Sequence, residues 1–115
     1  MKGTAEEIRT LAYEELGVSP YIAVVGQDPG DGQVTVYAPR ATTRQAEALR
    51  IRLKVELPIG TEGFVRTTVC PRMCRASLTR TGSDIDGLGH AGCHLCGTRL
   101  PTFDRRLPMH ARRAR

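Results

Sequence analysis

At 115 residues, with 40% hydrophobic and 25% charged residues, the chain has room for one domain, or for one small domain and a metal-stabilised module. No apolar run approaches the length of a membrane-spanning helix, and the acidic N-terminus lacks the apolar core of a secretory signal, so we expect a cytoplasmic protein with no membrane partner. The net charge of +5 is unevenly spread: residues 1–69 carry eight Lys and Arg against nine Asp and Glu, whereas residues 70–115 carry nine Arg against three Asp. This asymmetry favours an anionic partner for the C-terminal part.

Two segments carry helix signals. Residues 4–17 begin with Thr4 as N-cap and Glu7 at the capping-box position, and Gly17 is placed to end the helix. Residues 42–57 are ambiguous. They start with a second capping box, but their apolar residues from position 49 onward also alternate as in a strand. We predict a helix to about residue 53 followed by an extended exit, with a strand over 49–57 as the alternative.

Three segments carry strand signals. Residues 21–25 and 34–38 are rich in strand-forming residues and are separated by Asp-Pro-Gly and Asp-Gly turn sequences, which predicts a β-hairpin. A third strand is expected over 63–69, leading directly into Cys70.

Residues 1–69 therefore predict an α+β fold with the order α-β-β-α-β, in which two helices cover one face of a three-stranded sheet. They contain no Cys or His and no serine in a nucleophile context, so we interpret them as a scaffold or a binding surface and the protein as non-enzymatic. The expected core consists of Ile8, Leu11, Leu16, Ile22, Val24, Val34, Val36, Leu49, Leu53, Val65 and Val69.

All four cysteines of the chain lie between residues 70 and 96, in two close pairs. Cys70 and Cys74 enclose three residues, and Cys93 and Cys96 enclose two. Because Zn²⁺ prefers four soft ligands in a tetrahedron, two short loops that each carry two thiolates predict one structural zinc ion bound by the four cysteines.

The segment from about residue 68 to 101 resembles a zinc ribbon, in which two cysteine knuckles hold one zinc ion. The resemblance rests on the four cysteines and on Gly97, which follows the second pair. It implies a structural metal site, and it places the module among folds common in nucleic-acid-processing proteins and in protein-binding roles. The predicted organisation is thus a scaffold domain over 1–69, a zinc module over 70–101 and a flexible tail over 102–115.

Other interpretations of this region remain open. His90 or His94 could replace one cysteine in a Cys₃His site, the cysteines could form two disulfides in an exported protein, or they could bind an iron–sulfur cluster. Asp84 and Asp86 lie in a glycine-containing stretch that is typical of a turn, without the further oxygen ligands that a calcium loop needs.

Arginines dominate the charge of the C-terminal part, because the chain has no lysine after residue 54. Arginine clusters bind phosphates, so the expected partner is nucleic acid or a nucleoprotein, and the alternative is an acidic protein partner in an assembly or regulatory role. With 4% aromatic residues and no Trp, stacking on single strands is not expected. The candidate partner-binding residues are Arg72, Arg75, Arg80, Arg99, Arg105, Arg106, Arg112, Arg113 and Arg115.

Overall fold

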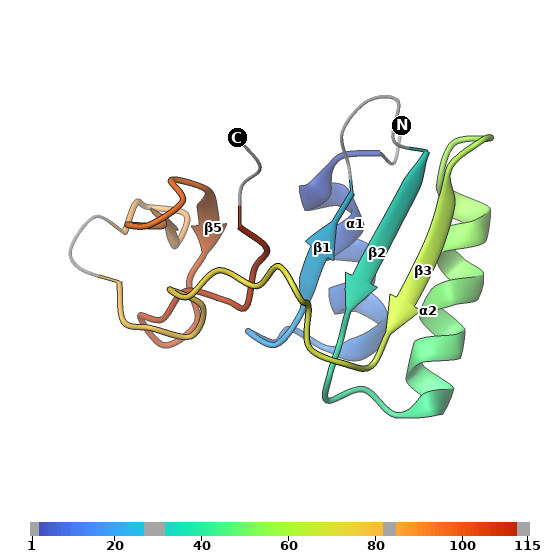
Figure 1. Ribbon diagram of the computed structural model, residues 1–115, viewed down its shortest axis with the longest axis horizontal. Coiled ribbons are helices and arrows are strands. Elements are labelled where there is room, and N and C mark those ends of the chain that lie inside the picture. Colours follow the sequence, from blue (N-terminus) through green and yellow to red (C-terminus); the bar gives the residue numbers. More distant parts are fainter. Residues whose placement is uncertain (1–2, 27–31, 82–84, 113–115) are drawn as a thin grey trace.

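The structure is a computed structural model that describes residues 3–26, 32–81 and 85–112 (Figure 1). It confirms a mixed α+β fold. The described residues form the helices α1 (Ala5–Leu16) and α2 (Thr43–Glu56) and the strands β1 (Ala23–Val25), β2 (Gln33–Tyr37), β3 (Glu62–Arg66), β4 (His90–Gly92) and β5 (Arg99–Pro101). No helix in these ranges is both long and apolar enough to span a membrane.

Both helices begin at the predicted capping boxes. At the start of α1 the Thr4 side chain accepts a hydrogen bond from the backbone N–H of Glu7, and the Glu7 side chain accepts one from Thr4. Thr42 and Gln45 make the same reciprocal pair at the start of α2. These bonds satisfy backbone N–H groups that have no partner inside a helix.

The ambiguous segment is helical as far as Glu56, three residues beyond the predicted end, and it is not a strand. The side chains of Leu49 and Leu53, one helical turn apart, are fully buried, whereas Ile51 is 53% and Val55 is 78% exposed. The helical period therefore accounts for which residues are buried. Ile51 and Val55, which fit the alternating pattern, lie on the solvent side of the helix.

The large sheet has the order β1-β2-β3. Strands β1 and β2 pair antiparallel, with Val24 opposite Val36, as the hairpin prediction requires. Strand β3 pairs parallel to β2, and α2 supplies the crossover between them. Both helices lie on the same side of the sheet, as expected (Figure 1). Helix α2 packs so closely on β3 that a Cβ atom on Gly63 would lie 2.9 Å from Leu53 Cβ.

The predicted core is confirmed with one exception. Ten of its eleven residues belong to the buried cluster between helices and sheet or pack against it, together with Ala12, Ala38 and Leu57. The prediction that Val69 is buried is wrong, because its side chain is 54% exposed. Strand β3 ends at Arg66, and the chain has left the sheet before it reaches Val69.

Residues 102–112 differ from the expected flexible tail. Leu107, Pro108, Met109 and His110 are buried, because this segment runs antiparallel beside residues 72–81. The ladder includes hydrogen bonds from Arg112 N to Arg72 O, from Leu78 N to Leu107 O and from Thr81 N to Arg105 O. A second core cluster forms there from Cys74, Ala76, Cys93, Leu100 and Leu107.

Residues 103–109 also contact the N-terminal half of the chain, which we define as residues 3–69, the C-terminal half being residues 70–112. The backbone N–H of Met109 donates to the carbonyl oxygen of Pro20. The ring of Phe103 packs edge-on against Tyr13 of α1, with 5.9 Å between centroids and 84° between planes. In Figure 1 the two halves accordingly lie side by side, with β1 nearest to the C-terminal half.

Candidate metal centre

Four side chains converge at the second core cluster. The ligand atoms of Cys74, Cys93, Cys96 and His110 all lie within 4.8 Å of one another, and together they could hold a metal ion. Three of these residues are buried and Cys96 is half-buried. The four come from three separate segments of the chain, so an ion at this point would join all three.

The Cys93–Cys96 turn is a knuckle of the expected kind. The backbone N–H groups of Leu95 and Cys96 point at the sulfur of Cys93, at N···S distances of 3.4 and 3.5 Å. Gly97 closes the turn with φ +75°, a left-handed conformation that side chains disfavour, and its N–H donates to the carbonyl oxygen of Cys93 at 2.9 Å. Such N–H···S contacts stabilise a thiolate, and they orient it before a metal binds.

The antiparallel ladder brings Cys74 and His110 together. Cys74 N donates to the carbonyl oxygen of His110 at 2.7 Å, and the neighbouring residues Met73 and Ala111 form a β-bridge. Ser77 fixes the backbone of His110 further, since its hydroxyl accepts from His110 N at 3.0 Å. Residues at the beginning and the end of the C-terminal half thereby reach the same point.

The hydrogen bonding of His110 determines which ring nitrogen is available. Its Nδ1 lies 2.7 Å from the carbonyl oxygen of Pro108. Because a carbonyl oxygen only accepts hydrogen bonds, Nδ1 carries the proton and Nε2 presents a lone pair. Nε2 is buried and has no hydrogen-bond partner. This is the arrangement of a metal-binding histidine, whose second nitrogen is oriented by a backbone carbonyl.

Electrostatics of the cluster favour a bound cation. Burial raises the pKa of the Cys74 thiol to about 11, and the neighbouring Cys93 contributes to the rise. Buried thiolates crowded together are unfavourable without a positive charge among them. A metal ion supplies that charge and allows the thiols to ionise.

The structure groups three of the four predicted cysteines and places His110 with them, whereas Cys70 is not in the group. Cys70 is 3% exposed, and its carbonyl oxygen accepts from Met73 N in the turn that leads to Cys74. A Cys₃His set was an alternative, but neither histidine named for it belongs to the cluster. His94 is exposed inside the knuckle, and His90 lies on β4.

The spacing of the sequence contains a signal for His110. Cys93 and Cys96 are followed by thirteen residues and then His110, and a histidine 12–15 residues after a Cys-x₂-Cys pair is a common zinc-ligand spacing. Because residues 102–115 are predicted to form a flexible tail, His110 is not among the predicted ligands.

The disulfide alternative is not what the structure shows. All four cysteines lie in the described ranges and none forms a disulfide; Cys74 Sγ and Cys93 Sγ are 3.8 Å apart, against about 2.05 Å for an S–S bond.

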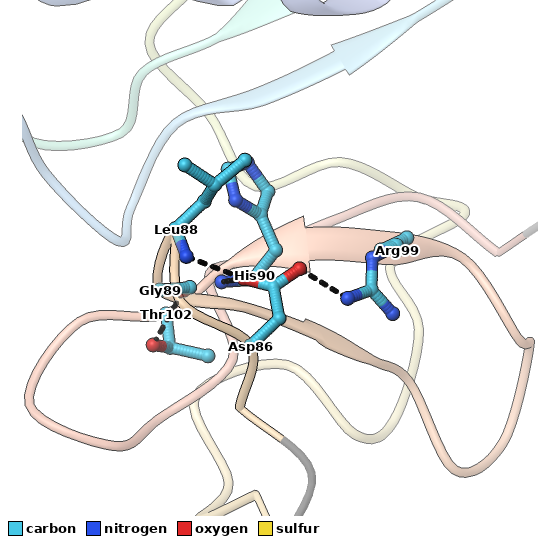
Figure 2. Close-up of polar contacts among 6 residues, drawn as sticks. All are labelled: Asp86, Leu88, Gly89, His90, Arg99 and Thr102. Atoms are coloured by element: carbon cyan, nitrogen blue, oxygen red, sulfur yellow. Dashed lines mark hydrogen bonds and ion pairs between the residues drawn. The ribbon is translucent and has the colours of Figure 1, made fainter.

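Asp86 has a structural part in the β4–β5 hairpin (Figure 2). One carboxylate oxygen accepts from the backbone N–H groups of Leu88 and His90, each at 2.9 Å, and the other pairs with Arg99. These bonds lower the pKa of Asp86 to about 2, and the bond from His90 N has the largest effect. The His90 ring points away from this carboxylate in Figure 2, so the two do not form an acid–base pair. Asp84 lies outside the described residues.

The predicted arginines in the described ranges are all exposed. Arg99 is paired with Asp86, and it is the one member of the set with an ion pair inside those ranges. Arg80 and Arg106 lie directly opposite each other in a β-bridge. The exposed members are Arg72, Arg75, Arg80, Arg99, Arg105, Arg106 and Arg112, and Arg113 and Arg115 lie outside the described residues.

Comparison of the chain with protein-family models, with curated proteins and with solved structures found no significant match.

Proposed function

We propose that the protein is a non-enzymatic zinc protein whose structural metal centre supports a basic surface that binds nucleic acid. The observation that carries the zinc assignment is the convergence of three cysteine sulfurs with the unpartnered Nε2 of His110. Zinc is the usual ion for a closed site of sulfur and nitrogen ligands. Cys74, Cys93, Cys96 and His110 would hold it, leaving no open position for a substrate.

The distance between two of the sulfurs supports this assignment. In a regular tetrahedron with Zn–S bonds of about 2.3 Å, the ligand atoms are about 3.8 Å apart. Cys74 Sγ and Cys93 Sγ are 3.8 Å apart. The four ligand atoms all lie within 4.8 Å of one another, a close grouping that suits a single ion at their centre.

Elemental mass spectrometry of the purified protein tests the metal, and we expect one zinc per chain. Replacement by Co²⁺ should give the absorption of a tetrahedral thiolate-ligated site, in which three sulfurs and one nitrogen are distinguishable from four sulfurs. Iron in place of zinc, or a chain that binds neither zinc nor cobalt, would refute the assignment.

Support for a nucleic-acid partner comes from the exposed arginines of the same half, six of which form no ion pair within the described residues. Like charges directly opposite in a β-pair repel each other, and the Arg80–Arg106 bridge keeps two of them together at the surface. A polyanion would neutralise both. Because the aromatic side chains are few, we expect contacts to phosphates, with little preference for sequence.

Fluorescence anisotropy with labelled duplex DNA and RNA at several salt concentrations tests this part. The Arg80→Gln/Arg106→Gln variant should bind more weakly, and the slope of log K against log salt should fall by about 1.8 for two lost phosphate contacts on duplex DNA. The matched control is Arg44→Gln/Lys54→Gln, which removes two exposed charges from α2. Equal losses in both variants would mean that only the net charge matters.

A protein partner is the second candidate. Leu88 is 83% and Leu95 is 55% exposed on the C-terminal half, and such side chains are more useful at a protein interface than against phosphates. If the protein does not bind nucleic acid at physiological salt, this alternative is favoured.

A further inference from the structure

A cavity of about 170 Å³ lies between α1 and the β4–β5 hairpin. Four of its lining residues are on α1 and two are on the hairpin, so it lies where the N-terminal and C-terminal halves meet. Its volume is sufficient for several water molecules or one small ion. The lining residues are Glu6, Arg9, Thr10, Tyr13, His90 and Pro101.

Unsatisfied polar groups are concentrated in the walls of this cavity. Among the described residues, four buried side-chain polar atoms have no hydrogen-bond partner. One is His110 Nε2, which the metal site explains. The other three are Arg9 Nε, Tyr13 Oη and His90 Nδ1, and all three residues line the same cavity. Buried polar groups are almost always satisfied, so three such atoms at one place indicate that a ligand or ordered water completes their hydrogen bonds.

The charge of Arg9 defines that ligand further. Arg9 is only 7% exposed, and no hydrogen bond or ion pair joins its side chain to another residue in the described ranges. Burial lowers the pKa of its guanidinium, yet the group keeps its proton in proteins. Glu6 and Tyr13 are the groups that act on its charge, and Glu6 is exposed at the surface of α1. A buried cation of this kind requires an anion in contact with it.

The donors indicate the type of anion. A guanidinium can only donate hydrogen bonds, a phenol donates readily, and an imidazole can donate from Nδ1. Asp86 holds the backbone of His90 through the bond from His90 N, and so positions the third donor (Figure 2). An oxyanion has several oxygen acceptors around one central atom, so it can accept hydrogen bonds from donors on two sides of a cavity. Arginine is the preferred partner of phosphate.

We propose that this cavity binds a small phosphate-type oxyanion through Arg9, Tyr13 and His90. The site is separate from the exposed arginines of the C-terminal half, and it links the two halves of the molecule through one ligand. An anion bound there would stabilise their contact, because α1 contributes two of the donors and β4 the third.

Titration of the zinc-loaded full chain with inorganic phosphate tests the proposal, with the Nε–H signal of Arg9 followed by ¹H–¹⁵N NMR. A saturable shift of that signal is expected, and Arg9→Gln should abolish phosphate binding measured by calorimetry. Tyr13→Phe removes one oxygen and keeps the ring against Phe103; it should weaken binding at least about tenfold, as expected for a lost hydrogen bond to a charged ligand. Tyr37→Phe, on β2 outside the cavity, is the matched control and should bind as the wild type does.

Three results would overturn the proposal. The first is the absence of a saturable Arg9 shift, and the second is equal phosphate affinity in the wild type and Tyr13→Phe. The third is tighter binding of acetate than of phosphate, which would assign the cavity to a carboxylate. Arg80→Gln/Arg106→Gln should leave phosphate binding unchanged, which separates this site from the proposed nucleic-acid surface.

Discussion

The backbone N–H of Cys74 donates to the carbonyl oxygen of His110 at 2.7 Å, so the first and last residues of the metal cluster are neighbours across an antiparallel ladder. Together with the rest of the ladder, this contact closes a loop of 37 residues, counted from position 74 to position 110. Closing a loop of that size costs conformational entropy, which a metal ion bound to both ends would offset.

Replacement of His110 should therefore affect metal binding more than replacement of Cys70. We expect His110→Ala to lower zinc affinity by at least about 100-fold, since even the removal of an outer-shell partner costs roughly 10–100-fold. Cys70→Ala should keep one zinc per chain. Competition with a chromophoric chelator measures both. Loss of zinc in Cys70→Ala with retention in His110→Ala would instead restore the all-cysteine site.

Removal of the metal should destabilise the C-terminal half selectively. The two core clusters share no residue, and the smaller one includes two of the proposed metal ligands, Cys74 and Cys93. Chelation, or Cys93→Ser, should therefore lower amide protection in residues 72–81 and 105–112 while the protection of α1, α2 and β2 stays unchanged. Hydrogen exchange measured by mass spectrometry distinguishes this outcome from unfolding of the whole chain and from no change at all.

The metal-free protein should be sensitive to alkaline pH. The pKa of Cys74 is raised from 9.0 to about 11 in the fold, so folding favours the protonated thiol. The stability contributed by this group is complete below pH 9 and is lost as the pH rises through 11. Zinc affinity should change in the opposite direction, rising with pH because the Cys74 proton must leave when the metal binds. Chemical denaturation of the two forms between pH 7 and 11 checks both signs.

Gly63→Ala should destabilise the N-terminal core. The new methyl group would lie 2.9 Å from Leu53 Cβ and 3.0 Å from Leu57 Cδ1, and the first of these atoms cannot move away without moving α2. Overpacking of this kind costs about 1–3 kcal/mol. Gly87→Ala is a suitable control, because no atom lies within 4 Å of its added methyl group. Urea denaturation of both variants gives the comparison, and equal midpoints would contradict the close packing of α2 on β3.

Asp86→Asn should loosen the start of β4. The variant keeps an oxygen acceptor but loses the ion pair with Arg99 and the charge that strengthens the bonds from Leu88 and His90. Faster exchange of those two amides is expected, together with weaker phosphate binding in the cavity that His90 lines. Asp104→Asn, at an exposed position of the same half with φ +51°, should change neither.

Local signals in the sequence were sufficient for the helix starts and the hairpin of the N-terminal half. Capping boxes at Thr4 and Thr42 and the turn residues between 25 and 34 act within a few positions of the chain, so the helix starts and the hairpin could be predicted. The end of α2 could not be predicted, because the apolar residues from position 49 onward fit both the helical and the strand period. Packing against β3 decided between them, and it buried Leu53 and exposed Val55.

The sequence by itself determined that the C-terminal half would be organised by paired cysteines and would carry the positive charge. Only the tertiary structure decided which side chains meet. His110 joins Cys74 because residues 105–112 form a ladder with residues 72–81, and Arg9 and His90 line one cavity because α1 lies opposite the β4–β5 hairpin. Pairing across such distances is set by the burial of Leu107 and its neighbours, and no local pattern of residues encodes it.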